Sequence, residues 1–231
     1  MRYEIFGGSL PALRVSLEEG ESVCTQSGGM CWMSDGISID TNIKGGLLKG
    51  ISRVFSGDNL FLATFTAEKE NQTLICASKF PGEMLCLQME EGREIIIQRD
   101  AFLLAQPGVR VATETVKGMG RRFFGREAIA LQRLSGQGLV FLELDGSTQT
   151  VELAEGERLL ATTGNVAAYE TGVQYTVQTV RGFRNMLFGG DGLNLACLEG
   201  PGKVWLQTMT MHDFAGKLAP FMPGNEEKQQ P

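Results

Sequence analysis

A nine-residue motif recurs three times in this chain. In each copy a basic residue and a glycine precede an apolar residue, three variable positions, a bulky apolar residue, one more position and a second glycine. The copies cover residues 49–57, 117–125 and 181–189. A second motif, apolar-x-apolar-x-Glu-Gly, ends at Gly20, Gly92 and Gly156. Its successive copies are 72 and 64 residues apart, and those of the first motif are 68 and 64 residues apart, so the two motifs have nearly the same step along the chain. Because two independent motifs share one step, the sequence predicts three copies of one structural unit.

Short apolar stretches separated by turn residues fill each copy, a pattern typical of β-strands. In the third copy they are residues 150–153, 158–162 and 165–169. Each copy ends in two strands that we interpret as a hairpin, namely 61–66 with 73–77, 129–134 with 139–144, and 193–198 with 204–209. At about five strands per copy, the sequence predicts an all-β fold of three tandem antiparallel modules. The predicted modules cover about residues 3–80, 81–146 and 147–212, within a single domain over residues 1–222.

The nine-residue motif has the spacing of a helix. Leu47, Ile51 and Phe55 fall on one face, while Lys49 and Arg53 fall on the other. The glycine that closes each motif stands where a helix C-cap is expected, so the sequence predicts a short helical arm in each copy. Two interpretations stay open: a plug that closes one end of a sheet, or a binding element. The structural glycines of the arms are Gly50, Gly57, Gly118, Gly125, Gly182 and Gly189.

Basic residues are concentrated in these arms, although the chain has a net charge of −6. Residues 41–57, 115–126 and 180–190 contain no Asp or Glu, yet they hold nine of the 21 Lys and Arg residues. This clustering predicts a positive end that suits an anionic membrane surface, a phosphate backbone or an acidic partner protein. The alternative is a solvated face paired with nearby carboxylates. The candidate contact residues are Lys49, Arg53, Lys117, Arg121, Arg122, Arg181 and Arg184.

Composition narrows the class of protein. A chain of 231 residues with 42% hydrophobic residues can bury a substantial core, and its acidity argues against a nucleic-acid footprint over the whole surface. No signal peptide or apolar stretch of about 18 to 20 residues is found, so we expect a cytoplasmic protein. The five cysteines form no Cys-x-x-Cys pair, and we expect them to be small core residues. We expect Trp32 and Trp205 to be core or interface residues.

The residues of common enzyme chemistry are scarce in this sequence. His212 is the only histidine, so neither a histidine-rich metal site nor a histidine-based triad is available. Gly202-Lys203 lacks the remaining residues of a phosphate-binding loop, and Gly118-Met119-Gly120 lacks the third glycine of a dinucleotide motif. We therefore expect a non-enzymatic protein without cofactors, and we assign no catalytic, cofactor-binding or metal-ligating residue.

Three segments carry a family resemblance: residues 45–62, the run Thr64-Phe65-Thr66-Ala67, and the run Phe80-Pro81-Gly82-Glu83. Together they resemble the "altered inheritance of mitochondria" number-twenty-four family, and the similarity extends from about Tyr3 to His212. The resemblance implies a triplicated β fold around a pseudo-threefold axis, similar to the tryptophan RNA-binding attenuation protein. It also implies a role of the mitochondrial members in inner-membrane organisation, and no catalytic residues.

Two functions from different classes stay open. The first, which we favour, is a non-enzymatic oligomeric scaffold or assembly protein whose basic arms contact an anionic membrane surface or a partner protein. The second is a binding module for a small ligand or nucleic acid, with nucleic acid the less favoured partner. Exposed strand edges need to be covered, which predicts a homo-oligomer, most simply a trimer. Residues 223–231 have no apolar side chain beyond prolines and are expected to form a disordered tail.

Overall fold

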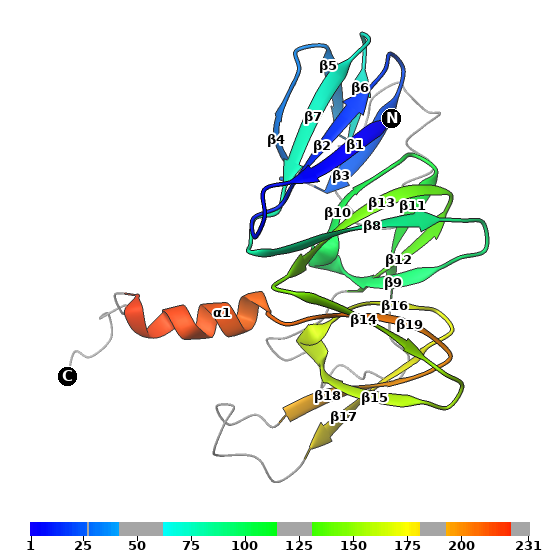
Figure 1. Ribbon diagram of the computed structural model, residues 1–231, viewed down its shortest axis with the longest axis vertical. Coiled ribbons are helices and arrows are strands. Elements are labelled where there is room, and N and C mark those ends of the chain that lie inside the picture. The colour runs from blue at the N-terminus through cyan, green and yellow to red at the C-terminus, as the bar shows by residue number, and fades with distance from the viewer. Residues whose placement is uncertain (27, 42–61, 115–130, 181–192, 223–231) are drawn as a thin grey trace, which may run out of the picture.

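The computed structural model describes residues 1–26, 28–41, 62–114, 131–180 and 193–222, and over these residues the protein is predominantly β (Figure 1). Its strands form four antiparallel sheets. The all-β class predicted from the sequence is therefore confirmed.

The strands follow one another in three groups along the chain. The first group contains β1 (Arg2–Phe6), β2 (Ala12–Leu17), β3 (Ser22–Gln26), β4 (Met30–Met33), β5 (Ile37–Thr41), β6 (Leu62–Ala67) and β7 (Gln72–Ala77). The second contains β8 (Gly82–Met89), β9 (Ile95–Gln98), the 3-10 turn η1 (Arg99–Ala101), β10 (Phe102–Ala105), β11 (Val109–Glu114), β12 (Leu131–Gly136) and β13 (Gly138–Asp145). The third contains β14 (Thr148–Leu153), β15 (Arg158–Thr162), the 3-10 turn η3 (Thr163–Asn165), β16 (Val166–Glu170), β17 (Gln174–Val180), β18 (Leu193–Glu199) and β19 (Gly202–Gln207). The helix α1 (Met211–Leu218) and the turn η4 (Ala219–Phe221) end the described chain.

The order in which strands pair repeats three times. The row β2-β7-β4 recurs as β8-β13-β10 and as β14-β19-β16, and the row β3-β6-β5 recurs as β9-β12-β11 and as β15-β18-β17. Each group of strands, hereafter a unit, thus supplies two three-stranded rows. The count of six repeated strands per unit exceeds the predicted five.

Neighbouring units share sheets. Sheet 1 is β1-β2-β7-β4, sheet 2 is β5-β6-β3-β10-β13-β8, sheet 3 is β11-β12-β9-β16-β19-β14, and sheet 4 is β15-β18-β17. Sheets 2 and 3 each join a row of one unit to a row of the next. In Figure 1 the units form an elongated stack, with sheet 1 at one end and sheet 4 at the other.

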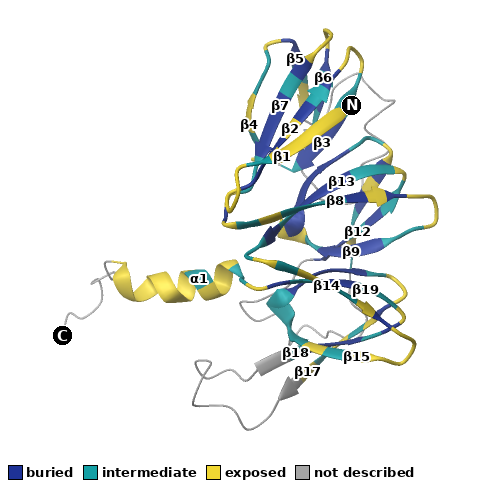
Figure 2. Cartoon of the chain, viewed as in Figure 1, coloured by how far each residue is buried: buried dark blue, intermediate teal, exposed yellow. Residues whose placement is uncertain are grey.

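Three buried clusters lie between successive sheets (Figure 2). The first core, between sheets 1 and 2, includes Leu13, Val15, Leu17, Val23, Phe65, Leu74, Leu104 and Phe141. The second core, between sheets 2 and 3, includes Cys24, Ile95, Ile97, Phe102, Val111, Leu142, Ala168 and Trp205. The third core, between sheets 3 and 4, includes Ile96, Leu153, Tyr169, Ala196, Leu198 and Val204. The inner sheets are buried on both faces, which explains the unbroken Ile95-Ile96-Ile97 run of β9.

The strands predicted in the third copy are confirmed as β14, β15 and β16. The three predicted hairpins are wrong. Their strands exist, but β6 and β7, β12 and β13, and β18 and β19 each belong to different sheets. Short turns join these strands; for example, Gly136 ends β12 and Gly138 begins β13, with φ of 92° and 131°. A tight turn between apolar strands is therefore compatible with a corner between two packed sheets as well as with a hairpin.

Helix α1 was not predicted. Thr210 is its N-cap, and the Thr210 hydroxyl oxygen accepts a hydrogen bond from the Asp213 backbone N–H at 3.1 Å. The helix is anchored by Phe214, whose ring packs edge-on against Phe80 with centroids 4.7 Å apart. The helical arms predicted at 49–57, 117–125 and 181–189 and the tail at 223–231 lie outside the described residues.

Candidate functional site

The predicted basic arms connect equivalent pairs of neighbouring strands. The first joins β5 to β6, the second β11 to β12, and the third β17 to β18. Within each pair the two strands are antiparallel partners. Since all seven candidate contact residues and all six structural glycines lie outside the described residues, their predicted roles stay predictions. The structure does establish that each unit carries one arm segment at the same place in its strand order.

An ion-pair network lies beside the second arm segment. Arg133 of β12 binds Glu114, the last residue of β11, with 2.6 Å between Nε and a carboxylate oxygen, and it also binds Glu94. The hydrogen bond to Glu114 is the main cause that raises the pKa of the Arg133 guanidinium above its ordinary value. A fixed cation thus lies between two carboxylates where this arm segment begins.

Two strand pairings join the units, and we call them the first and second junctions. In the first junction β10 pairs with β3, and in the second β16 pairs with β9. The Cα partners are Leu104–Thr25 and Ala105–Cys24 in the first junction, and Ala168–Ile97, Tyr169–Ile96 and Glu170–Ile95 in the second. Apart from Glu170, these residues are at most 6% exposed. The same register at both junctions means that one docking geometry is used twice.

Side chains reinforce the second junction. The side-chain amide nitrogen of Gln98 (β9) shares its two N–H donors among three carbonyl oxygens where η3 meets β16, those of Thr163, Gly164 and Val166, at 2.8 to 3.2 Å. Arg93 and Glu170 form an ion pair across the junction with an N–O distance of 3.0 Å. These contacts fix the third unit against the second by directional bonds in addition to apolar burial.

Strands β4 and β15 lie at the two ends of the stack and are equivalent to the junction strands, but each has an open edge. Within the described part of the chain, β4 pairs on one side with β7, and β15 pairs on one side with β18. Trp32 of β4 is 60% exposed and Leu160 of β15 is 55% exposed. We call the outer sides of these strands the β4 edge and the β15 edge. Sequence reasoning named Trp32 but missed Leu160, because exposure follows from where a strand lies in the stack.

Burial divides the cysteines. Cys24, Cys76 and Cys197 are buried, and burial raises the pKa of the Cys24 thiol to about 11 and that of the Cys76 thiol to about 12. The expectation that all five are core residues is wrong for Cys31, which is exposed on β4. Its counterparts in the strand order, Leu103 and Ala167, are buried because a neighbouring unit lies against them.

Neither a metal site nor a membrane-spanning helix is found within residues 1–26, 28–41, 62–114, 131–180 and 193–222. Over these ranges no group of three or more His, Cys, Asp or Glu side chains is arranged to hold a metal ion. Nor does any helix within the same ranges have the length and apolar character needed to cross a membrane.

The chain is thus an all-β protein of three repeated strand groups whose sheets pass from one group to the next. It belongs to the family described as Mitochondrial biogenesis AIM24, whose family model matches residues 3–209. The family resemblance inferred from the sequence is confirmed by this match.

Two bacterial relatives extend the comparison. The chain is 23% identical over 221 residues to an uncharacterised protein of Streptococcus pyogenes serotype M6, covering 92% of this chain and 87% of that protein. It is also similar to a Streptococcus pyogenes protein whose X-ray crystal structure was solved by a structural genomics consortium. That similarity has a TM-score of 0.75 at 22% identity and covers 96% of this chain and 99% of the other. The likeness supports the fold.

Proposed function

We propose that this protein is a non-enzymatic, homo-oligomeric assembly protein that presents three basic arms to an anionic membrane surface. The observation that carries the proposal is the placement of the arm segments, one in each unit, between equivalent strands. Because the strand pair that carries an arm segment occurs once in each unit, the chain offers three basic segments. Several weak electrostatic contacts made by one protein combine into stronger attachment to the membrane. The acidic remainder of the chain leaves the arms as the main source of attraction to an anionic surface.

Finer features belong to the same proposal. The likeness to the tryptophan RNA-binding attenuation protein fold is kept in this proposal, and the repeated strand order supports it. The pseudo-threefold axis expected within one chain is not part of it, because the two ends of the elongated stack do not meet (Figure 1). The oligomer is a trimer, the compartment is the cytoplasm, and the protein acts by binding. The scarcity of histidine in the sequence supports a binding role.

Vesicle co-sedimentation tests the membrane contact. We expect the protein to pellet with vesicles that contain phosphatidylserine and to remain in the supernatant with pure phosphatidylcholine vesicles. Pelleting should fall steeply between 50 mM and 500 mM salt, because added salt shortens the range of electrostatic attraction to a few ångströms. A variant with five arm cations changed to Gln should lose pelleting while it keeps its fold; these are Lys49, Lys117, Arg121, Arg122 and Arg181.

A matched control changes the same net charge elsewhere. Five exposed cations of the described body are replaced by Gln: Arg2, Lys69, Arg99, Arg110 and Lys217. This control should pellet as the wild type does. Equal pelleting by wild type and arm variant, or none by wild type at low salt, contradicts the proposal. Salt-sensitive binding of an oligonucleotide without vesicle binding supports the second functional class instead.

A further inference from the structure

We propose that the β4 edge of one chain pairs with the β15 edge of a second copy of the same chain, and that this pairing continues the sheets from chain to chain. The inference rests on the homo-oligomer of the proposed function and specifies how its subunits join. In the strand order, β4 is the counterpart of β10 and β16, and β15 is the counterpart of β3 and β9. A pairing of β4 with β15 would therefore join the same two kinds of strand that pair at both junctions, where β10 binds β3 and β16 binds β9.

The junction registers predict the contact residue by residue. The partners Leu104–Thr25 and Ala168–Ile97 occupy equivalent positions at the two junctions. Carried to the free edges, that register places Trp32 opposite Ala161, Met33 opposite Leu160 and Ser34 opposite Leu159. Because a shift of one residue would turn every side chain to the opposite face, the repeated register sets a single way for the edges to pair.

The exposed side chains match buried ones at the junctions. Trp32 is 60% exposed, whereas its counterparts Leu104 and Ala168 are at most 1% exposed. Leu160 is 55% exposed, whereas its counterparts Cys24 and Ile96 are at most 3% exposed. Those counterparts belong to cores formed between units. The same pairing between chains would take Trp32 and Leu160 out of water, which stabilises association through the loss of exposed apolar surface.

Charge also suits the contact. The next position in the register brings Asp35 opposite Arg158. At the second junction the equivalent residues are Thr171 and Glu94, and there the Thr171 N–H donates a hydrogen bond to the Glu94 carbonyl oxygen at 3.3 Å. The Asp35 side chain is 94% exposed and the Arg158 side chain 68% exposed, although each also has a partner within its own chain: Asp35 lies 3.9 Å from Lys69, and Arg158 lies 2.6 Å from Glu199. Opposite charges at facing positions favour this register and disfavour pairing of an edge with a copy of itself.

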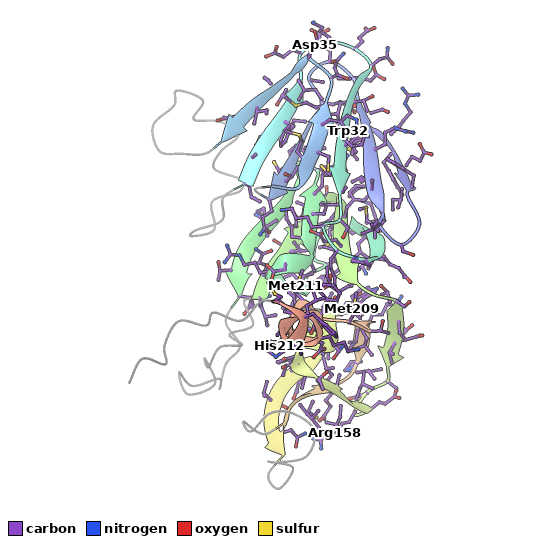
Figure 3. The ribbon with its side chains drawn as sticks, turned by 90° about the vertical axis from the view of Figure 1, so that its left-hand side faces the viewer. Trp32, Asp35, Arg158, Met209, Met211 and His212 are labelled. Carbon is purple, nitrogen blue, oxygen red and sulfur yellow. The ribbon has the colours of Figure 1, made fainter. Side chains whose placement is uncertain are left out.

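The two edges lie too far apart to meet within one chain. Figure 3 shows Trp32 and Asp35 near one end of the elongated molecule and Arg158 near the other. A contact between different edges is head-to-tail, and it generates a ring when the rotation per chain closes. Closure after three chains gives the cyclic trimer of the proposed function.

Light scattering on two edge variants and their mixture tests the pairing. Trp32→Lys and Leu160→Lys each place a charge on one edge, and each variant alone should lose assembly and show the mass of one chain. Each variant still has the opposite edge intact. An equimolar mixture should therefore show the mass of two chains, in which the intact β4 edge of one variant binds the intact β15 edge of the other.

The control variant is Ile39→Lys, which charges an exposed apolar residue on β5, the end strand of sheet 2. It should keep the wild-type mass. Circular dichroism of all three variants should match that of the wild type, because the substituted side chains are exposed within one chain.

Alkylation of Cys31 gives a second readout that needs no substitution. Cys31 lies on β4 next to Trp32, and its junction counterparts are buried. Its alkylation rate in wild-type protein should rise on dilution as the assembly dissociates, while that of the half-buried Cys86 should stay constant. The Leu160→Lys variant should lose Cys31 protection as well, although Leu160 is at the far end of the chain.

The possible failures are distinguishable. A wild-type chain that is monomeric at micromolar concentration overturns both this inference and the oligomer of the proposed function. An oligomeric wild type whose edge variants keep its mass overturns the edge pairing alone. A mixture that stays at one chain mass, or Cys31 reactivity that is unchanged across assembly, also overturns the edge pairing.

Discussion

Glycines at equivalent turns of the three units show how one residue is constrained by its backbone. Gly20, Gly92 and Gly156 close the repeated Glu-Gly motif with φ of 80°, 82° and 73°. At each of them a Cβ would meet open space, so the left-handed backbone alone favours glycine. Gly82 is constrained in a different way, because a Cβ there would lie 1.8 Å from the carbonyl oxygen of Leu144.

The two kinds of constraint predict different costs. Gly92→Ala should lower the free energy of unfolding by about 1 kcal/mol, the cost of a side chain in the left-handed region. Gly82→Ala should lower it by more, at about 3 kcal/mol, because the β8 and β13 backbones have to separate. Urea denaturation of both variants measures the difference. Equal losses, or a larger loss for Gly92→Ala, would contradict these assignments.

Glu143 predicts a pH dependence of stability. Burial is the main cause that raises the pKa of this β13 carboxyl above its ordinary value, against hydrogen bonds from Ser78 and Lys79. A raised pKa in the folded state means that its contribution to stability is present at low pH and is lost as pH rises through that pKa. Glu143→Gln should therefore stabilise the fold at pH 7, and its advantage should shrink towards pH 4.

Urea midpoints of wild type and Glu143→Gln at the two pH values check this expectation. Glu83→Gln on the neighbouring strand β8 is the control, since Glu83 is exposed and its charge stays hydrated. A Glu143→Gln variant that is less stable than wild type at pH 7 would show that the ionised carboxylate is favoured there.

At the scale of elements, the sequence predicted strand positions better than strand partners. The turns at Gly92 and Gly156 and the third-copy strands could be read from alternation and spacing. The sheet to which each strand belongs could not, because β12 and β13 are both apolar and the turn between them suits a corner or a hairpin. Helix α1 did have a local signal, the Thr-x-x-Asp pattern that begins at Thr210.

The N-cap of α1 can be tested directly. Thr210→Ala removes the hydroxyl that accepts from the Asp213 N–H and should cost about 1 kcal/mol of local helix stability. Amide hydrogen exchange over residues 213–218 should then accelerate about fivefold, because exchange in an exposed helix follows local opening. Thr210→Ser keeps the acceptor and should exchange at the wild-type rate. An unchanged rate in Thr210→Ala would indicate that the Phe214–Phe80 contact holds the helix without the cap.

At the scale of the whole molecule, the two inner sheets differ from the two end sheets. Sheets 2 and 3 each combine rows of two units and are buried on both faces, whereas sheets 1 and 4 contain rows of one unit. The triplication was readable from the sequence, but the exposure of Trp32 and Leu160 was not. Their side chains resemble those of buried counterparts, and only the end position of β4 and β15 distinguishes them.

Assembly of the chain into a homo-oligomer, on which the proposed function and the edge pairing both depend, is measured by its mass in solution. Light scattering at micromolar concentration should give the mass of three chains for the full-length protein. A chain that ends at Met222 should give the same number of subunits, because the β4 and β15 edges, and not residues 223–231, join the copies. The mass of a single chain for the full-length protein would show that the copies do not assemble.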